Sequence, residues 1–341
     1  MLIRTISGKF IKSLLIILNY ATFENATIRH IVETMQDIWK VIVNPNAGSG
    51  RGSREWNEIS DLLTAAGIQF SSETSRFKYN SIDLVKQAYQ EGYRKFIAVG
   101  GDGTIHEVVS GIMSLNKHDP DVTLAVIPVG TGNDWGREWG VTTDHKQAVD
   151  LIAKGHTKVQ DLAEVHSMRN GKENTRFMVN IGGLGFDANV CFKVDGYKDA
   201  GKTGSSLYVR GLLRAFFGYT NKRFKIDVDG ERIFEGPVFS TAFGIGKYSG
   251  GGMIQTPEAL PDDGLLEVTV IKKIPKLKVI FSIKKLYSGD IYTIKQVIHT
   301  KAKEVHVESF PFAKVEVDGE AVGFTPVTVS MIPQALRIIV P

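Results

Sequence analysis

The pattern that most limits the fold of this chain is an alternation of strand-like and helix-like segments between Trp39 and about Ala163. The run Phe96-Ile97-Ala98-Val99 is continuously apolar, as in a strand buried on both faces. The apolar residues that follow recur at helical spacing, at Ile105, Val108, Val109 and Ile112. Strands that alternate with helices form a parallel sheet covered by helices, with ligands beyond the carboxyl ends of its strands. The sequence therefore predicts an α/β, Rossmann-like domain.

Three of the predicted strands end in glycine-rich turns, at residues 44–52 (NPNAGSGRG), 100–104 (GGDGT) and 130–134 (GTGND). Glycines allow left-handed backbone and let N–H groups approach an anion at a helix N-terminus. Because the turns follow strands of one parallel sheet, we expect them to converge on one crevice with a phosphate as ligand. Asp102 would repel a phosphate unless a Mg²⁺ ion or a hydroxyl donor lies between them. For GGDGT alone, a plain turn with a solvated aspartate is the alternative.

After about Asp161 the pattern changes to short alternating runs bounded by Gly, Asp and Pro, such as RFKIDVDG, LLEVTVI and EVHVES. Such runs predict an antiparallel sheet domain, interrupted by helical patterns at Ser205–Phe217 and Lys276–Leu286. Residues 196–203 (GYKDAGKT) fit the P-loop expression, but polar Lys193 and Asp195 interrupt the run before them. We therefore do not interpret them as a phosphate site.

Composition narrows the possible classes of protein. A chain of 341 residues, 43% hydrophobic and 23% charged, is typical of a globular protein with two domains. The net charge of +4 is too small to indicate nucleic-acid binding, but it is compatible with anionic phosphates or an acidic membrane surface. The single cysteine, Cys191, excludes an internal disulfide framework and fits a reducing cytosol.

The first 36 residues precede the first predicted strand and form a separate extension. Lys9 and Lys12 come before the apolar stretch 14–18, which is too short to span a bilayer. We interpret residues 1–34 either as upstream of a translation start at Met35 or as a weak membrane anchor.

Six motifs follow one another along the chain: Asn44-Pro45 with Gly48 and Gly50, residues 100–104, 128–134 (PVGTGND), 180–187 (NIGGLGFD), 261–264 (PDDG) and 317–320 (VDGE). In this order they resemble the bacterial diacylglycerol kinase and lipid kinase family, relatives of sphingosine and ceramide kinases, and the resemblance covers the chain from Trp39 onward. NAD kinases and phosphofructokinases have turns like GGDGT, but the combination with GTGND and a late VDGE is more specific. The resemblance implies an α/β nucleotide domain at residues 37–163, a β-sandwich at 164–324, an active site between them, and a final segment, 325–341, that returns to the first domain.

The resemblance also implies roles for single residues. Asp102 would act through Mg²⁺ and the phosphates, and Glu320 would be the general base. Asp263 and the carbonyls of Leu260 and Leu265 would form a structural magnesium site. The implied ATP contacts are Asn44, Thr74, Gly100, Gly101, Asp102, Gly103, Thr104, Ile105, His106, Gly130, Thr131 and Asn133.

The chemistry of these residue types is compatible with those roles. Phosphoryl transfer needs charge neutralisation and alignment, and a carboxylate can take the proton of an alcohol. Both assignments have an alternative without a catalytic or metal-binding role. Glu320 could be a glutamate of a hairpin that turns at Asp-Gly, and residues 262–264 could form a plain turn.

The sequence departs from the family pattern at two places. His106 stands where the family commonly has Asn, and residues 78–81 (KYNS) stand where Gly-His-Ala often occurs. We interpret His106 as a polar position on the first helical turn rather than as a catalytic base.

The resulting hypothesis is an ATP- and Mg²⁺-dependent lipid kinase that converts diacylglycerol to phosphatidic acid. The alternatives are a kinase of sphingoid bases, ceramide or another lipid alcohol, an NAD kinase, and a catalytically silent nucleotide- or lipid-binding regulator. We expect a cytoplasmic protein that attaches peripherally to the inner face of the membrane and has no nucleic-acid partner. A homodimer is an assembly that the sequence allows. Lysines interleave with apolar residues at 272–286, as in a membrane-surface helix or a solvated helix packed on the sandwich.

Overall fold

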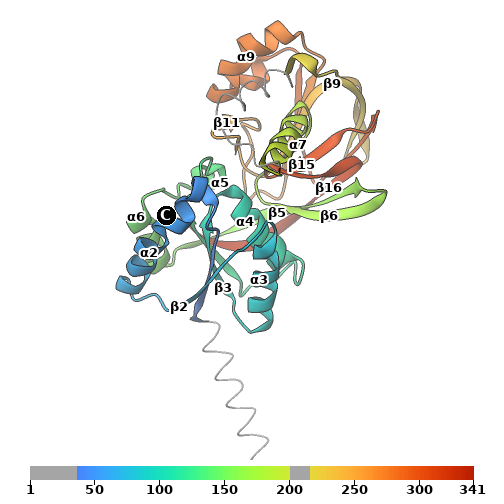
Figure 1. The fold of residues 1–341 in the computed structure, drawn as a ribbon. Helices are drawn as coiled ribbons and strands as arrows, with labels where there is room; N and C mark the ends of the chain where they lie inside the picture. The colour runs from blue at the N-terminus through green and yellow to red at the C-terminus, as the bar shows by residue number, and fades with distance from the viewer. Residues whose placement is uncertain (1–36, 200–215) are drawn as a thin grey trace, which may run out of the picture.

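The computed structural model describes residues 37–199 and 216–341. The N-terminal extension, the second half of the P-loop-like stretch and most of the helical pattern at 205–217 lie outside these residues. Figure 1 shows two parts, one above the other, which we call the first half (β1 to α6) and the second half (β5 to β16).

The first half is a parallel sheet with strand order β2-β1-β3-β4. Its strands are β1 (Trp39–Val43), β2 (Phe70–Thr74), β3 (Lys95–Gly100) and β4 (Thr123–Pro128), and its helices are α2 (Ala47–Ala65), α3 (Asn80–Gln90), α4 (Asp102–Met113), α5 (Asp134–Trp139) and α6 (His145–Lys154). Alternate residues of β3 enter different apolar clusters: Phe96 and Ala98 pack with α3 and α4, and Ile97 and Val99 pack with α2 and α6. The strand is therefore buried on both faces, as its apolar run predicted.

The register of the parallel sheet brings the strand ends level with one another. Val43 lies opposite both Thr74 and Val99, and Gly100 lies opposite Pro128. The turns that follow β1, β3 and β4 consequently start at the same edge of the sheet, as expected for one crevice.

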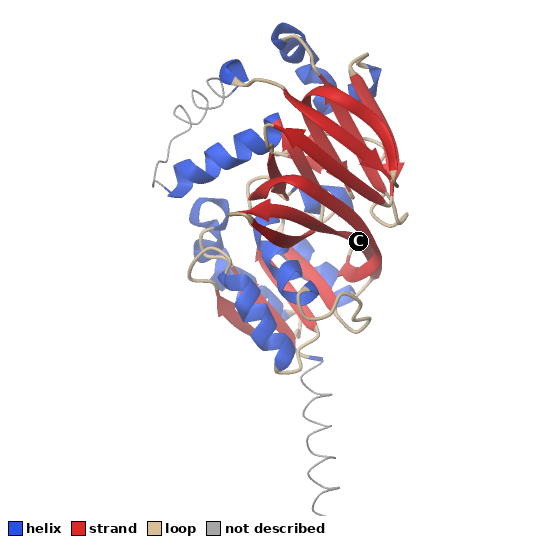
Figure 2. Ribbon diagram, turned by 90° about the vertical axis from the view of Figure 1, so that its right-hand side faces the viewer, coloured by secondary structure: helices blue, strands red, loops and turns tan. Residues whose placement is uncertain are grey.

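The second half is rich in antiparallel strands and has its own apolar core, which includes Phe224, Phe243 and Val305. Figure 2 shows these strands gathered above the helix-covered sheet of the first half. Its elements are β5 (Thr157–Arg169), β6 (Lys172–Met178), β7 (Ile181–Gly185), α7 (Phe186–Asp199), β8 (Lys222–Val228), β9 (Glu231–Gly244), β10 (Tyr248–Ser249), β11 (Met253–Ile254), β12 (Leu266–Lys272), α9 (Lys276–Ser288), the 3-10 helix η1 (Asp290–Thr293), β13 (Val297–Ala302), β14 (Glu304–Phe310), β15 (Lys314–Val317) and β16 (Glu320–Ile339). The predicted fold class, α/β followed by a β-rich domain, is confirmed.

Strand β16 belongs to both halves. Its 20 residues pair in turn with β15, β14 and β5, and its end lies parallel to β4, with Arg337 opposite Thr123 and Ile338 opposite Leu124. The hydrogen-bonded sheet therefore continues from the second half into the first.

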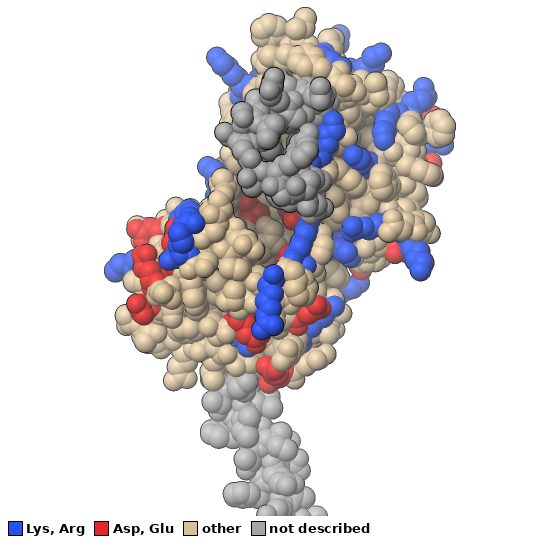
Figure 3. All heavy atoms as spheres, in the orientation of Figure 1, with Lys and Arg blue, Asp and Glu red and all other residues tan. Residues whose placement is uncertain are grey.

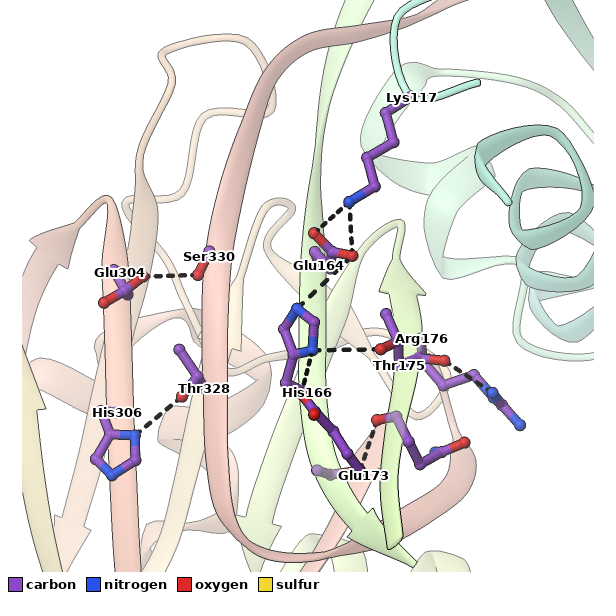
Figure 4. Close-up of polar contacts among 12 residues, drawn as sticks. Lys117, Glu164, His166, Glu173, Thr175, Arg176, Glu304, His306, Thr328 and Ser330 are labelled. Atoms are coloured by element: carbon purple, nitrogen blue, oxygen red, sulfur yellow. Dashed lines mark hydrogen bonds and ion pairs between the residues drawn. The ribbon is translucent and has the colours of Figure 1, made fainter. Parts of the chain in front are cut away.

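Polar side chains cover one face of the strands near this junction (Figure 4). Lys117, which follows α4, donates to both carboxylate oxygens of Glu164 on β5, each at 2.7 Å. His166 Nδ1 lies 2.9 Å from Glu173 and 3.2 Å from Thr175 on the neighbouring strand β6. The face continues with Glu304 bonded to Ser330 and His306 bonded to Thr328. The Lys117–Glu164 pair thus links the first half to the second.

Candidate active site

The three glycine-rich turns meet at the carboxyl edge of the parallel sheet. Asn44 donates from Nδ2 to Thr104 Oγ1 at 3.0 Å, which joins the first turn to the second. The second and third turns touch through their backbones, because a Cβ on Gly130 would lie 2.5 Å from the Cα of Gly101. Only glycines allow this approach. The predicted convergence of the turns is confirmed.

The turn after β1 has a left-handed backbone for three successive residues. Gly48, Ser49 and Gly50 have φ values of 57°, 57° and 85°. A Cβ on Gly48 would lie 2.1 Å from the carbonyl oxygen of Val129, so this turn packs directly on the chain leading into the third.

Asp102 is the first residue of α4 and binds the start of α5. Its Oδ1 accepts the Trp135 N–H at 3.0 Å, and its Oδ2 accepts the Asp134 N–H at 3.2 Å. Burial raises the pKa of the Asp102 carboxyl, these N–H donors oppose the rise, and the neighbouring Asp134 carboxylate adds to it. The side chain is therefore held rigidly and beside a second acid.

The carboxylates of Asp102 and Asp134 face a common point. A Cβ placed on Gly132 would lie 3.1 Å from Asp102 Oδ2 and 3.4 Å from Asp134 Oδ2. Two carboxylates repel each other, and oxygen-only donors suit a hard cation such as Mg²⁺. The donor set therefore fits the predicted magnesium at Asp102. Asp134 is a second donor that the motif analysis did not assign, although it ends the GTGND motif.

Glu320 reaches the second turn from the other half of the molecule. It begins β16, and its Oε1 lies 3.6 Å from the position of a Cβ on Gly103. Its Oε2 lies 2.7 Å from Lys78 Nζ and 3.4 Å from Tyr79 Oη. Figure 3 shows acidic atoms at the floor of a hollow between the halves, with basic side chains beside it. Of the two residues predicted to be catalytic, Asp102 thus lies within the GGDGT turn and Glu320 lies beside it.

A buried pair beside this turn joins the halves and positions Glu320. The His106 side chain is 1% exposed, and its Nδ1 lies 3.0 Å from Asp318 Oδ2. Asp318 also accepts the N–H groups of Val179 and Asn180, each at 2.9 Å. The imidazole therefore contacts the turn that carries Glu320, and the apolar side chain of Ile105 lies in the core. The side chains of His106 and Ile105 are therefore engaged elsewhere. The contacts with ATP that were predicted for these two residues would have to be made by their backbone atoms.

The remaining predicted nucleotide contacts lie on the same edge of the sheet. Thr74 ends β2, and Thr131 is exposed on the third turn. Asn133 has a left-handed backbone, with φ of 49°, and its Nδ2 donates to the Gly130 carbonyl at 2.9 Å. The Asn133 side chain therefore shapes its own turn. The contacts of all these residues with ATP stay predictions.

At the predicted structural magnesium site, Asp263 is bound to a lysine. Its Oδ2 lies 2.6 Å from Lys301 Nζ, and its Oδ1 accepts the Leu265 N–H at 3.0 Å. The adjacent Asp161 accepts the N–H of Gly264 at 2.6 Å. The ammonium group already supplies the countercharge, so these residues do not fit an additional cation unless Lys301 moves. A magnesium ion held here with the Leu260 and Leu265 carbonyls stays a prediction.

Buried acids behind Glu320 were not found by sequence reasoning. The Glu316 carboxyl accepts the Gly319 N–H at 2.9 Å. Burial raises its pKa to about 8, with smaller contributions from nearby acids, Asp187 and Asp318 among them. In the run Lys314–Val317 the alternation indicates a solvent-facing glutamate, but β15 lies between β7 and β16 in the sheet, and α7 packs against it. Only the tertiary structure reveals this burial.

Two of the residues that depart from the family pattern, Lys78 and Tyr79, touch Glu320. Lys78 and Tyr79 precede α3, and Glu107 on α4 holds them by accepting the Tyr79 N–H at 2.9 Å and the Ser81 N–H at 3.2 Å. Tyr79 itself has a left-handed backbone, with φ of 69°. The residues at positions 78–81, where the sequence departs from the family pattern, therefore help to shape the crevice.

Comparison with known proteins adds independent information. Residues 39–165 match the diacylglycerol kinase catalytic domain, and residues 181–340 match the YegS C-terminal NAD kinase beta sandwich-like domain. A diacylglycerol kinase of Staphylococcus carnosus is 29% identical over 303 residues, which cover 89% of this chain and 94% of the relative. A diacylglycerol kinase of Mycobacterium tuberculosis is 26% identical over 301 residues, covering 88% and 94%.

Solved structures give the same result for the fold. A protein of Bacillus anthracis, provisionally named a diacylglycerol kinase, superposes with a TM-score of 0.70 and 26% identity, covering 89% of this chain and 97% of that one. Yeast NADH kinase complexed with NADH superposes with a TM-score of 0.51 and 12% identity, covering 89% and 83%, which indicates a shared fold alone.

Proposed function

The chain belongs to the diacylglycerol kinase catalytic domain family, and from that premise we propose that it transfers the γ-phosphoryl group of ATP to a lipid hydroxyl. Diacylglycerol is the proposed acceptor and phosphatidic acid the product. The observation that carries the proposal is that Glu320, from the second half, borders the glycine turn of the first half that contains Asp102. A transfer site needs a phosphate-binding side and an acceptor side at one place.

The phosphate-binding side consists of the three glycine turns and two acids. The glycines give the phosphates access to backbone N–H groups, and Asp102 with Asp134 would hold Mg²⁺. Magnesium, when bound, would neutralise phosphate charge that builds up during transfer. The Asp134 carboxylate is itself fixed by the N–H groups of Gly251 and Gly252, at 2.8 and 2.7 Å. The second half therefore helps to orient a residue of the phosphate-binding side.

The acceptor side is centred on the Glu320 carboxylate. As the acceptor oxygen bonds to the γ-phosphorus, the bond from that phosphorus to the bridging oxygen breaks, and ADP leaves with the electron pair. Glu320 takes the proton of the hydroxyl group. Lys78 and Tyr79 contact Oε2 of Glu320, while its Oε1 lies on the side of Gly103. We therefore propose that Lys78 and Tyr79 orient the base.

Helix α9 supports action at a membrane surface. Within the described helix no residue is buried, and its large apolar side chains include Leu277 and Phe281, which are 70% and 81% exposed. Lysines at positions 276, 278, 284 and 285 lie among them. Exposed apolar side chains with lysines suit insertion at the surface of an anionic bilayer. None of the helices in the described parts of the chain is long and apolar enough to cross a bilayer. The exposed apolar side chains and the lysines of α9 are the support for our proposal of peripheral attachment, at the cytoplasmic face.

The direct test is phosphorylation of a panel of acceptors. The protein is incubated with labelled ATP, Mg²⁺ and anionic vesicles that contain diacylglycerol, monoacylglycerol, ceramide or a sphingoid base, with soluble NAD as a separate acceptor. We expect labelled phosphatidic acid, and a strong loss of label with Glu320→Gln. Label in NAD alone, or no transfer to any lipid by the wild-type protein, would contradict the proposal.

A further inference from the structure

Three potential metal ligands gather in the second half, outside the crevice described above. Glu267 lies on β12, His299 lies on β13, and Glu258 precedes β12 in the chain. One ligand atom from each residue lies within 4.8 Å of those of the other two. Two carboxylates and one imidazole offer the oxygen and nitrogen donors that Zn²⁺ takes in proteins. None of the three residues has a part in the proposed kinase reaction.

The buried carboxylate of Glu267 lacks a partner on one oxygen. The residue is 1% exposed, and its Oε1 accepts the Tyr292 O–H at 2.6 Å. Its Oε2 is buried and has no hydrogen-bond donor among the described residues. A buried carboxylate oxygen without a donor is unfavourable, because the group has lost its water and gained nothing in exchange. The Glu267 carboxylate therefore has one oxygen, Oε2, that a cation can bind, while its Oε1 holds the Tyr292 hydroxyl and faces His299.

The spacing of the other ligand atoms suits a metal better than direct hydrogen bonds. His299 Nδ1 lies 3.5 Å from Glu267 Oε1 and 4.0 Å from Glu258 Oε2. Hydrogen bonds of this kind are normally about 2.7–3.2 Å long. Ligands bonded to one tetrahedral zinc at about 2.0–2.2 Å would be separated by roughly 3.4 Å. Small shifts of the exposed Glu258 side chain would complete the site.

The neighbouring residues supply an outer shell of the kind that surrounds metal ligands. The His299 ring stacks on Tyr292, with centroids 3.7 Å apart and planes 10° apart, and the hydroxyl of Tyr292 holds Glu267. Thr269 Oγ1 contacts the same hydroxyl at 3.1 Å. Lys301, the cross-strand neighbour of Glu267, has its ammonium group on Asp263. Two carboxylates and a neutral imidazole would balance one divalent ion.

We propose that Glu258, Glu267 and His299 bind a Zn²⁺ ion that fastens the segment before β12 to strands β12 and β13. A solvent molecule would take the fourth position. This site is structural, and its occupancy does not depend on the kinase reaction.

The test measures metal binding by the full chain. Protein prepared with a tag that does not bind metal is treated with a chelator, dialysed and titrated with ZnCl₂ alone, and the metal content after gel filtration is measured. We expect one ion per chain, a higher melting temperature with zinc, and a visible d–d absorption band when Co²⁺ replaces it. An absence of saturable binding, or a Co²⁺ complex without this band, would overturn the proposal.

Three variants locate the ion. His299→Phe keeps a ring against Tyr292, Glu267→Gln keeps an acceptor for the Tyr292 hydroxyl, and Glu258→Gln changes a side chain that is 60% exposed and so should not disturb folding. Each should weaken zinc binding by more than about 100-fold, because loss of an outer-shell partner alone costs about 10–100-fold. The exposed His156, changed to Ala, is the matched control and should bind zinc like the wild type. Unchanged affinity in the Glu258→Gln and His299→Phe variants would place the ion elsewhere and refute the site.

Discussion

At the scale of single residues, Glu316 makes stability depend on pH. Burial raises the pKa of its carboxyl from 4.5 to about 8, so the folded protein holds a proton that the unfolded chain releases. The contribution of the protonated Glu316 carboxyl to the free energy of unfolding is fully present below about pH 4.5. It is lost as the pH rises toward 8. Glu316→Gln keeps an acceptor for the Gly319 N–H and removes the titration. We expect the melting temperature to fall less between pH 5 and 9 in this variant than in the wild type.

The measurement is thermal unfolding at several pH values. The exposed residue Glu308, changed to Gln, serves as the control, since it is a similar carboxyl on the surface of β14. Parallel pH profiles for wild type and Glu316→Gln would show that Glu316 is ionised in the folded protein at neutral pH, contrary to this account.

Removing the charge of Asp102 and removing the charge of Glu320 should impair different parts of the phosphoryl-transfer reaction. Glu320→Gln removes only proton acceptance, so kcat for lipid phosphorylation should fall by about 10²- to 10⁴-fold with ATP affinity nearly unchanged. Asp102→Asn removes a proposed magnesium ligand, so transfer to any acceptor should fall, including slow hydrolysis to water. Steady-state kinetics with nucleotide binding separates the two effects. Weakened ATP binding with normal saturated turnover in Glu320→Gln would make this residue a nucleotide contact instead.

The candidate site could be predicted from sequence where a motif gives both residue type and position. Asp102 and Glu320 stand in such motifs, and the structure brings them together. Asp134 was missed although it belongs to GTGND, because the motif alone does not show that its carboxylate turns toward Asp102. Glu316 was missed because alternation along a strand cannot reveal that a helix covers the face on which it lies.

At the scale of elements, the turn at 261–265 should depend on Lys301 rather than on a metal. Lys301→Met would leave the Asp263 carboxylate, which is 21% exposed, without its cation. We expect a loss of about 1–3 kcal/mol in the free energy of unfolding, between the values typical of surface and buried pairs. Denaturant unfolding with and without Mg²⁺ measures it. In the Asp102→Asn variant, which lacks the other proposed magnesium ligand, stability should not change with Mg²⁺, and a strong dependence would support the predicted magnesium site.

Helix α9 should control attachment to vesicles without affecting the chemistry. Leu277→Ser with Phe281→Ser removes its two most exposed apolar side chains, so binding to anionic vesicles should weaken and activity on vesicle-bound lipid should fall. Activity on a short-chain acceptor dissolved as monomers should be retained. Vesicle sedimentation and both assays test this. Leu115→Ser, an exposed position after α4, is the control, and equal vesicle binding by the double variant and this control would exclude α9 as the attachment surface.

Most elements of the first half were predictable because the apolar residues of each one follow a single pattern, either that of a buried strand or that of a helix. The expected strand at Phe96–Val99 and the helical pattern from Ile105 to Ile112 correspond to β3 and α4. Strand β16 was not recognised as one element, because Pro326 and Pro333 interrupt its pattern and its register with β5 shifts twice. Each shift changes which residues face inward, so no single alternation runs through it.

At the scale of the whole molecule, the two halves should unfold together. They share β16 and β5, and the His106–Asp318 pair is buried between them. All four tryptophans lie in the first half, at positions 39, 56, 135 and 139. Tryptophan fluorescence therefore reports on that half, and far-ultraviolet circular dichroism reports on both. We expect coincident denaturant midpoints. A fluorescence transition well separated from the dichroism transition would mean that the shared strands do not couple the halves.

The pairing of β16 with β4 also sets an order of events during synthesis. The chain leaves the ribosome from its N-terminus, so β4 emerges long before residues 337 and 338, which later lie beside it. Until then, β4 lacks the strand that later pairs with it and is an edge strand of the parallel sheet, where other nascent chains could add. A chaperone that covers this edge during translation would therefore matter more for this protein than for one whose first domain closes on its own. A chain terminated before β16 would be a substrate for proteolysis rather than a free nucleotide-binding domain.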